Sequence, residues 1–474
     1  MPSTPPQGSP LAPPWLRVPD DVNALHPGVW SHHAARDSDG VVRIAGVSVA
    51  ELARDYGTPL YVVDEADVRA RARDARDAFD REAARIGTTA RVYYASKAFL
   101  CAEVARWVTA AGLGVDVASG GELALALAAG VDPAVIGLHG NNKSVAEIQR
   151  AVDAGVGTIV VDSVIEVERI AAAARHASVT QNVRLRVNSG VHAHTHEYLA
   201  TAREDQKFGI TLADAPAVVA QIRSHPHLRF VGLHCHIGSQ ISGLDGFQES
   251  ARRLLAVHAE LLVGGAVPEL NLGGGFGIRY TEADDALSFA EIAAGLADIV
   301  AAECARLQIP VPHLAVEPGR AIVGPSTATL YEVGTVKPVT VDGGAVRTYV
   351  SVDGGMSDNA RPALYEADYA ARVVSRSSAA APVLARVVGK HCESGDIVVN
   401  ADYLPADVAP GDLLATPATG AYCWSLSSNY NFVPRPAVVA VVEGTSRVLV
   451  RADTEQDLLS RDAGLIPADE STNG

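Results

Sequence analysis

The feature that most limits the fold is an alternation of short β-rich runs and helical stretches between residues 90 and 320. Each run is rich in β-branched and aromatic residues, and an alanine- and leucine-rich stretch with helical spacing follows it. Such alternation implies right-handed crossovers and a parallel sheet. Eight units over about 230 residues predict a (β/α)8 TIM barrel. A doubly wound open sheet is the structural alternative, but the pattern gives no clear switch point. The eight runs read ARVYYASK, GLGVDVAS, VIGLHGN, GTIVVDS, VRLRVNS, FVGLHCHIGS, LNLGGGF and HLAVEPGR.

A second domain is expected after Arg320, where the helical spacing ends. Alternating strands with closely spaced Gly, Pro and Asp turn signals follow, and they are typical of an antiparallel β-barrel or sandwich. The stretch GVVRIAGVSVAEL precedes the barrel and can add a strand to this domain. The predicted division is a proline-rich arm over 1–26, strands of the β domain over 27–58, the barrel over 59–320, the C-terminal β domain over 321–460 and a frayed tail over 461–474.

Charge and cysteine usage exclude several classes of protein. The formal net charge of -16 argues against a nucleic-acid or acidic-membrane partner, which would need a basic surface. No apolar run reaches the roughly 18–20 residues that a membrane span requires, and the N-terminus lacks the apolar core of a signal peptide. The cysteines form no CxxC pair, which indicates a reducing compartment rather than disulfides or a zinc site. We therefore expect a cytoplasmic protein. Its cysteines are Cys101, Cys235, Cys304, Cys392 and Cys423.

Polar groups or bare glycines follow every predicted barrel strand. Active sites of such barrels form at the C-terminal ends of the strands, so these residues are expected to converge. Each one alone has an ordinary reading as a turn residue or helix cap, but eight such ends favour a functional ring. In chain order the ring contains Lys97, Asp116 with Ser119, His139 with Asn141 and Asn142, Asp162, Asn188, His236 with Ser239, Gly273 to Gly275, and Glu317 with Arg320.

Several members of this ring together indicate pyridoxal 5′-phosphate (PLP). The backbone N–H groups of Gly273–Gly275 suit a phosphate, and barrels often bind phosphate in the loops after the seventh and eighth strands. A glycine run can also be a plain turn, but its place beside Ser239 and Arg320 favours phosphate binding. Lys97 can form a Schiff base with the cofactor's aldehyde. Glu317 can keep the pyridine nitrogen protonated, which makes the ring an electron sink.

The motifs around these positions are YYASKA, GVDVASGGEL, HGNNKS, RVNSGVHAHTHEYLATAREDQKFGI, GLHCHIGSQI, NLGGGFGIRY, EPGR, KHCESGD and GAYCWSLSSNYN. Together they resemble the diaminopimelate decarboxylases, which belong to the fold-type III, alanine-racemase-like PLP-dependent decarboxylase family. The resemblance runs from about residue 58 to about residue 440. It implies a PLP-binding barrel with a C-terminal β domain, and decarboxylation of meso-2,6-diaminopimelate to L-lysine and CO2, the last step of lysine biosynthesis. The alternatives are a related PLP-dependent decarboxylase of the ornithine, arginine or carboxynorspermidine type, and a non-catalytic PLP-binding homologue.

The resemblance also implies roles for individual residues. Lys97 would bind the cofactor covalently, His236 would stack on its ring, and Glu317 would pair with the pyridine nitrogen. Cys392, in HCES, matches the proposed proton donor, which this family supplies from the neighbouring subunit, so a homodimer with a shared active site is implied. The cofactor-binding set is Lys97, His236, Ser239, Gly275, Glu317, Pro318, Gly319, Arg320 and Tyr422, and the substrate-binding set is Arg320, Arg361, Tyr365, Glu393 and Tyr422.

A charge count supports diaminopimelate over ornithine or lysine. Diaminopimelate keeps a second carboxylate and a second ammonium at its far end, and Arg361 with Glu393 can pair with them. An ornithine-type enzyme would have no use for Arg361. Glu317 argues against a racemase of the same fold, which usually places an arginine at the pyridine nitrogen. No metal is expected, because the alternate spacing of His192, His194 and His196 alone gives no closed ligand set.

Overall fold

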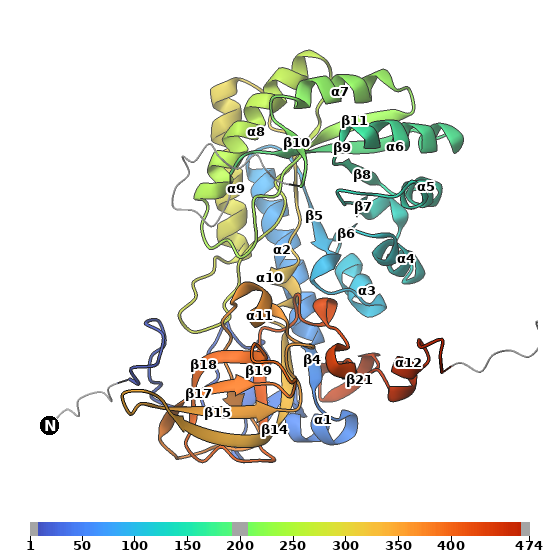
Figure 1. Ribbon diagram of the computed structural model, residues 1–474. Coiled ribbons are helices and arrows are strands. Elements are labelled where there is room, and N and C mark those ends of the chain that lie inside the picture. The colour runs from blue at the N-terminus through green and yellow to red at the C-terminus, as the bar shows by residue number, and fades with distance from the viewer. Residues whose placement is uncertain (1–7, 192–206, 466–474) are drawn as a thin grey trace, which may run out of the picture. The chain divides into compact units, whose positions relative to one another are not determined.

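The computed structural model describes residues 8–191 and 207–465, and the chain divides into two compact units (Figure 1). The barrel unit comprises Val68–Ile278 and Asp285–Gly324. The β unit comprises Met1–Asp67, Arg279–Asp284 and Pro325–Gly474. The triad His192, His194 and His196, the first seven residues of the predicted arm and residues 466–474 of the predicted tail lie outside the described residues.

Eight parallel strands of the barrel unit close on themselves in the order β5-β6-β7-β8-β9-β11-β12-β13, with β13 paired to β5 and β8 to β9. These are the eight runs read from the sequence, so the predicted TIM barrel is confirmed. The short strand β10 (Ile210–Thr211) adds to β9 outside the ring. The barrel strands are β5 (Ala90–Ala95), β6 (Gly114–Val117), β7 (Ile136–Leu138), β8 (Thr158–Val161), β9 (Gln181–Asn188), β11 (Leu228–His234), β12 (Glu269–Asn271) and β13 (His313–Val316).

Helices cover the outer face of the barrel, so its strands are buried on both sides. Strand β8 is buried at every position, as expected where one face meets the barrel interior and the other meets helices. Figure 1 shows α4, α5 and α6 on the outer side of β6, β7 and β8. Helix α5 begins with a capping box in which Ser144 and Glu147 satisfy each other's backbone N–H groups. The helices are α2 (Glu65–Arg85), α3 (Ala102–Ala110), α4 (Gly120–Ala128), α5 (Val145–Ala154), α6 (Val164–His176), α7 (Ala215–Ser224), α8 (Asp245–Val263), α9 (Phe289–Leu307) and α10 (Arg320–Val323).

The β unit contains a sheet with the strand path β18-β17-β15-β14-β4-β20-β21, with β19 paired to β14 and β16. Most neighbours are antiparallel, and the pairs β15–β17 and β20–β4 are parallel. This is the predicted separate β domain. Residues before the barrel contribute β4 and a small sheet, whose apolar side chains share one core with the long sheet. The elements are β1 (Ala34–Arg36), β2 (Val42–Ile44), β3 (Val47–Ser48), α1 (Val49–Tyr56), β4 (Leu60–Asp64), β14 (Thr327–Thr340), β15 (Val346–Val352), α11 (Arg361–Tyr365), β16 (Arg372–Val373), β17 (Pro382–Val388), β18 (Ile397–Pro405), β19 (Leu413–Pro417), β20 (Ala437–Val442), β21 (Thr445–Val450) and α12 (Glu455–Leu459).

The described part of the proline-rich arm is packed rather than extended into solvent. Leu11, Leu16 and Val18 pack against a small apolar cluster that includes Tyr403 of β18. The Ser9 amide donates to the Tyr403 hydroxyl at 3.0 Å. The arm is thus part of the β unit from residue 8 onward. Across 8–191 and 207–465, no helix is both long and apolar enough to cross a bilayer.

Candidate active site

Lys97 lies directly after β5, in a single 3-10 turn (Ser96–Ala98). Two contacts fix this turn: the Ala95 amide donates to the Pro318 carbonyl at 3.1 Å, and the Ser96 hydroxyl donates to Glu122 Oε2 at 3.1 Å. Lys97 keeps solvent access, yet surrounding protein desolvates its ammonium and lowers its pKa, against the opposing effect of Glu317. A larger fraction of free amine is therefore available at Lys97 than at an ordinary surface lysine.

Glu317, the residue after β13, is buried with hydrogen-bond donors on both carboxylate oxygens. Asn271 Nδ2 donates to Oε1 at 2.7 Å, and His234 Nε2 lies 3.2 Å from Oε2. Burial alone would raise the pKa of Glu317, but His234 and His139 hold it well below its usual range. Burial lowers the pKa of His234 to about 4, so this imidazole is neutral near pH 7 and donates from Nε2. Glu317 is therefore an ionised carboxylate that can pair with a cationic N–H group.

Asp116, at the end of β6, is the second carboxyl of this cluster. His139 Nε2 lies 3.4 Å from Asp116 Oδ1 and 3.4 Å from Glu317 Oε1. Neither Asp116 carboxyl oxygen has a hydrogen-bond partner among the described residues. Burial, followed by the charge of Glu317, raises the pKa of Asp116 well above its usual range. The two carboxyls thus divide their roles, with Asp116 protonated and Glu317 ionised.

The predicted phosphate loop combines close backbone packing with a cation. Gly275 has φ +99, and a Cβ there would lie 2.2 Å from the Gly238 carbonyl oxygen. A Cβ on Gly274 would lie 2.1 Å from the Glu317 carbonyl oxygen, so side chains are excluded at both positions. Arg320 Nη2 donates to Ser239 Oγ at 2.8 Å. The guanidinium therefore lies at the residue that follows Gly238, against which Gly275 packs. Bare backbone, a hydroxyl and a guanidinium together suit a phosphate.

His236 follows β11 and is half-buried beside this loop. The Gly274 amide donates to His236 Nδ1 at 3.4 Å. Burial, followed by the positive charge of Lys97, lowers the pKa of His236 well below its usual value. A neutral imidazole is suited to packing on an aromatic ring.

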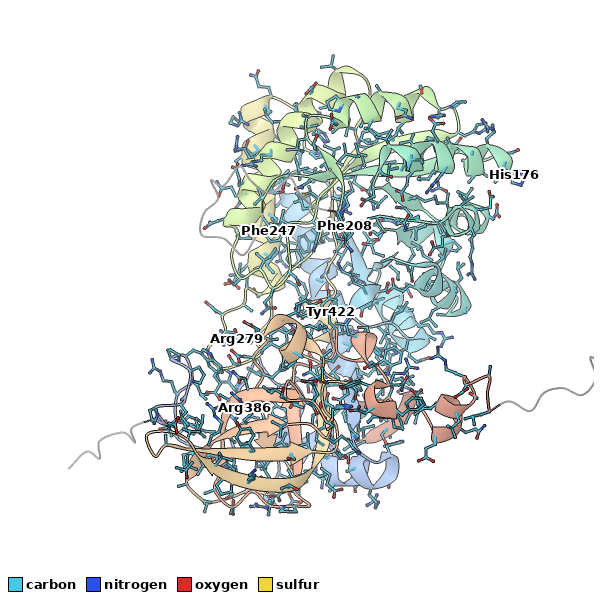
Figure 2. All side chains as sticks on the ribbon, viewed as in Figure 1. His176, Phe208, Phe247, Arg279, Arg386 and Tyr422 are labelled. Atoms are coloured by element: carbon cyan, nitrogen blue, oxygen red, sulfur yellow. The ribbon has the colours of Figure 1, made fainter. Side chains whose placement is uncertain are left out.

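Sequence reasoning gave no role to His234, Asn271 and Arg186. Arg186 lies 4.1 Å above the ring of Phe208, labelled in Figure 2, and 3.8 Å from Asp162 Oδ2. Strand alternation and strand-end position are the signals that could have found these three residues. Arg186 precedes Asn188 by two residues in β9, so both side chains point to the same face of that strand. His234 and Asn271 end β11 and β12, the positions at which the ring was expected.

The other predicted site residues lie in the β unit. Cys392 and Glu393 are exposed, and the Gly395 amide donates to Glu393 Oε1 at 3.1 Å and lowers the pKa of that carboxyl. Arg361 begins α11 and is 6% exposed, whereas Tyr365 at the end of the same helix is 64% exposed. Tyr422, labelled in Figure 2, is half-buried with φ 63, a left-handed conformation.

The residues present fit pyridoxal 5′-phosphate. Lys97 would supply an amine for the aldehyde, the glycines with Ser239 and Arg320 would form a phosphate cradle, and the ionised Glu317 suits a pyridinium N–H. Residues 65–324 match the family described as pyridoxal-dependent decarboxylase, pyridoxal binding domain. The fold and the site therefore define a PLP-dependent carboxy-lyase.

The chain belongs to the diaminopimelate decarboxylase family. It is 55% identical to the diaminopimelate decarboxylase of Mycobacterium tuberculosis (strain ATCC 25618 / H37Rv) over 92% of this chain and 98% of that protein. It is 48% identical to the diaminopimelate decarboxylase of Corynebacterium efficiens over 94% of this chain and 97% of that protein. The crystal structure of diaminopimelate decarboxylase from M. jannaschii in co-complex with L-lysine is similar, with a TM-score of 0.83 and 31% identity over 91% of this chain and 98% of that chain.

Proposed function

We propose that this protein decarboxylates meso-2,6-diaminopimelate to L-lysine and CO2, in the last step of lysine biosynthesis. The observation that carries the proposal is the pairing of a reactive lysine with a buried, ionised carboxylate in a barrel of the diaminopimelate decarboxylase family. The similar M. jannaschii structure contains L-lysine, the product of this reaction. Structures of lysine/ornithine decarboxylase from Vibrio vulnificus share 22% identity, a likeness that shows the fold alone.

The reaction breaks the bond between the substrate's α-carbon and its carboxylate, and a proton replaces the departing CO2. The chemistry that pyridoxal phosphate would supply here is an electron sink for the pair that this bond leaves behind. Glu317 stays ionised through Asn271 and His234, so it favours a protonated pyridine nitrogen. Arg320 and Ser239, joined by a hydrogen bond, would hold the phosphate group, and Lys97 would provide the amine that binds the cofactor before the substrate does.

The far end of the substrate requires a second set of groups. We assign Arg361 to the carboxylate that is retained and Glu393 to its neighbouring ammonium. Tyr365 and Tyr422 complete the proposed substrate set. An ornithine-type substrate has no carboxylate at this end, so the arginine is the residue that separates the two substrate classes.

Cys392 is proposed to deliver the proton to the α-carbon of the substrate bound in the active site of a neighbouring copy of the chain. Its exposure favours this arrangement, since a thiol on the surface of one chain can enter the site of another. Tyr430, whose ring lies 5.3 Å from that of the adjacent His391, is 40% exposed, and Phe432 is 70% exposed. Exposed aromatic side chains beside HCES are the kind that pack into subunit interfaces. We therefore propose a homodimer with a shared active site. A cytoplasmic location is proposed separately, from cysteines that form no CxxC pair.

Release of CO2 from purified, PLP-loaded protein tests the proposal. The substrates are the meso, LL and DD isomers of diaminopimelate beside ornithine, arginine and lysine. We expect turnover of the meso isomer to exceed that of every other compound, with L-lysine as the product. Preferred turnover of ornithine or arginine would contradict the substrate assignment, and a PLP-bound protein without turnover of any of them would indicate a non-catalytic homologue.

A further inference from the structure

Two tyrosines of the β unit hold the guanidinium of Arg361. Arg361 Nη1 donates to the Tyr369 hydroxyl at 2.6 Å. The guanidinium carbon lies 4.5 Å from the ring centre of Tyr280 and 5.5 Å from that of Tyr369. The two rings meet edge to face, with centres 5.0 Å apart and planes at 73°. Arg361 is thus fixed by one hydrogen bond and by stacking on a ring that carries negative charge density on its face.

A chain of hydrogen bonds fixes the Tyr369 hydroxyl in turn. Its oxygen lies 3.5 Å from Cys423 Sγ, and the Cys423 thiol donates to Asn359 Oδ1 at 3.4 Å. The Arg361 backbone amide also donates to Asn359 Oδ1, so this series of hydrogen bonds begins and ends at Arg361. Burial raises the pKa of Tyr369 well above its usual value, so the phenol keeps its proton and can donate to Cys423 while it accepts from Arg361.

The positive charge of Arg361 has no acidic partner in the part of the chain that the structure describes. Among the described residues, no carboxylate forms an ion pair with its guanidinium, and the groups in contact with it are uncharged phenols. The bond to Tyr369 uses one of five guanidinium N–H groups, so a planar fork remains for a ligand. A buried cation that is oriented but not paired within the described chain is prepared for an anion.

We propose that Tyr369 and Tyr280 are positioning residues that set Arg361 to receive the carboxylate at the far end of the substrate. They act through Arg361 and determine how strongly the enzyme prefers a substrate with a second carboxylate. The inference rests on the proposed role of Arg361. Cys423, which looks like a small packing residue in the sequence, belongs to the same chain of contacts.

Tyr369→Phe removes only the hydroxyl and tests the inference in the holoenzyme. We expect kcat/KM for meso-diaminopimelate to fall about 5- to 30-fold, mainly through KM, as for loss of a hydrogen bond to a charged group. L-lysine keeps the far carboxylate of the substrate, so its inhibition constant should rise by a similar factor. The inhibition constant of 1,5-diaminopentane, which has no carboxylate, should not change, and neither should spectrophotometric titration of the apoenzyme with PLP. Tyr280→Leu, which removes the stacking face, should shift the same two constants in the same direction.

Tyr403→Phe is the matched control, because it removes a buried hydroxyl of the same unit that bonds to Ser9. It should leave kcat/KM and both inhibition constants unchanged. Arg361→Ala separates the inference from the function on which it rests. If Arg361→Ala leaves the inhibition constant of L-lysine unchanged, the proposed binding of the far carboxylate by Arg361 is wrong. If Arg361→Ala weakens L-lysine while Tyr369→Phe does not, or if Tyr369→Phe weakens L-lysine and 1,5-diaminopentane equally, the positioning role is wrong.

Discussion

Asn271 donates from Nδ2 to Oε1 of Glu317 at 2.7 Å, across the ends of the neighbouring strands β12 and β13. This bond favours the ionised form of the carboxyl, so Asn271→Leu should raise the pKa of Glu317 toward the value that burial alone would give. Loss of a charge-assisted hydrogen bond costs about 1.5–3 kcal/mol, so we expect kcat to fall roughly 10- to 100-fold. Steady-state kinetics and PLP titration of the apoenzyme measure the effect.

Asn182→Leu provides the control for that substitution. Asn182 lies near the start of β9, at the opposite end of the barrel from Glu317, and its amide donates to the Gly157 carbonyl at 3.0 Å. Both variants lose a side-chain amide in a barrel strand, but only one loses a bond to the carboxylate. Equal losses of kcat in the two variants would contradict a specific role for Asn271.

Arg361→Ala should reduce kcat/KM for meso-diaminopimelate by roughly 30- to 1000-fold, since a carboxylate left unpaired in a desolvated pocket costs about 2–4 kcal/mol. The visible absorbance of the bound cofactor should not change, because Arg361 lies outside the phosphate loop. Discrimination against ornithine should shrink. Arg361→Lys should restore only part of the activity, since an ammonium lacks the planar fork. A variant that loses PLP, or that keeps full selectivity, would show that Arg361 has another role.

Lys97→Ala and Cys392→Ala should each be inactive and should complement one another when mixed. A mixed dimer contains one site with an intact Lys97 and an intact Cys392, because the two residues of a shared site come from different chains. Activity should therefore appear as subunits exchange, which native mass spectrometry of differently tagged chains can follow. Verified exchange without any recovered activity would contradict the shared site.

Asp358 gives the β unit a pH-dependent stability. Burial raises the pKa of this carboxyl to about 7, and its Oδ2 accepts from the Gly355 amide at 2.7 Å. The unfolded value is about 3.9, so between the two values the folded chain binds more protons than the unfolded chain. The stability from this group is full below about pH 3.9 and is lost as pH rises through about 7, with a slope of at most about 1.4 kcal/mol per pH unit.

Asp358→Asn should remove this slope, so the melting temperature of the variant should fall less than that of the unmodified enzyme between about pH 5 and about pH 8. Asp342→Asn, at an exposed turn, is the control and should leave the profile unchanged. Parallel melting profiles for Asp358→Asn and the unmodified enzyme would contradict the raised pKa. Scanning calorimetry at several pH values provides the measurement.

The barrel could be predicted from sequence because its strands lie between a packed interior and covering helices. Such strands are continuous apolar runs, and GTIVVDS corresponds to a fully buried β8. The pairing of the β unit is harder to predict. Leu60–Asp64 lies next to the start of the barrel in sequence, yet it pairs with β14 and with β20 from the far end of the chain. Register between segments so distant depends on tertiary packing, which local patterns do not encode.

The candidate residues of the barrel could be chosen from strand-end positions, because parallel strands bring their C-terminal ends to one face. The groups that tune these residues were missed for a physical reason. Asn271 and His234 are the last residues of β12 and β11, but they lie within the longer runs read from the sequence, and their roles depend on the distance to Glu317 rather than on a motif. Tyr369 was missed in the same way, since a buried tyrosine ordinarily indicates packing and only its 2.6 Å bond to Arg361 shows otherwise.

Covalent attachment of the cofactor to Lys97 can be measured directly. The chain contains five lysines: Lys97, Lys143, Lys207, Lys337 and Lys390. Borohydride reduction of the holoenzyme, followed by digestion and mass spectrometry, should place the phosphopyridoxyl group on Lys97 alone, with loss of CO2 release from meso-diaminopimelate in proportion to labelling. A label on Lys143 or another lysine, or full labelling of Lys97 with undiminished CO2 release, would show that Lys97 is not the lysine that binds the cofactor.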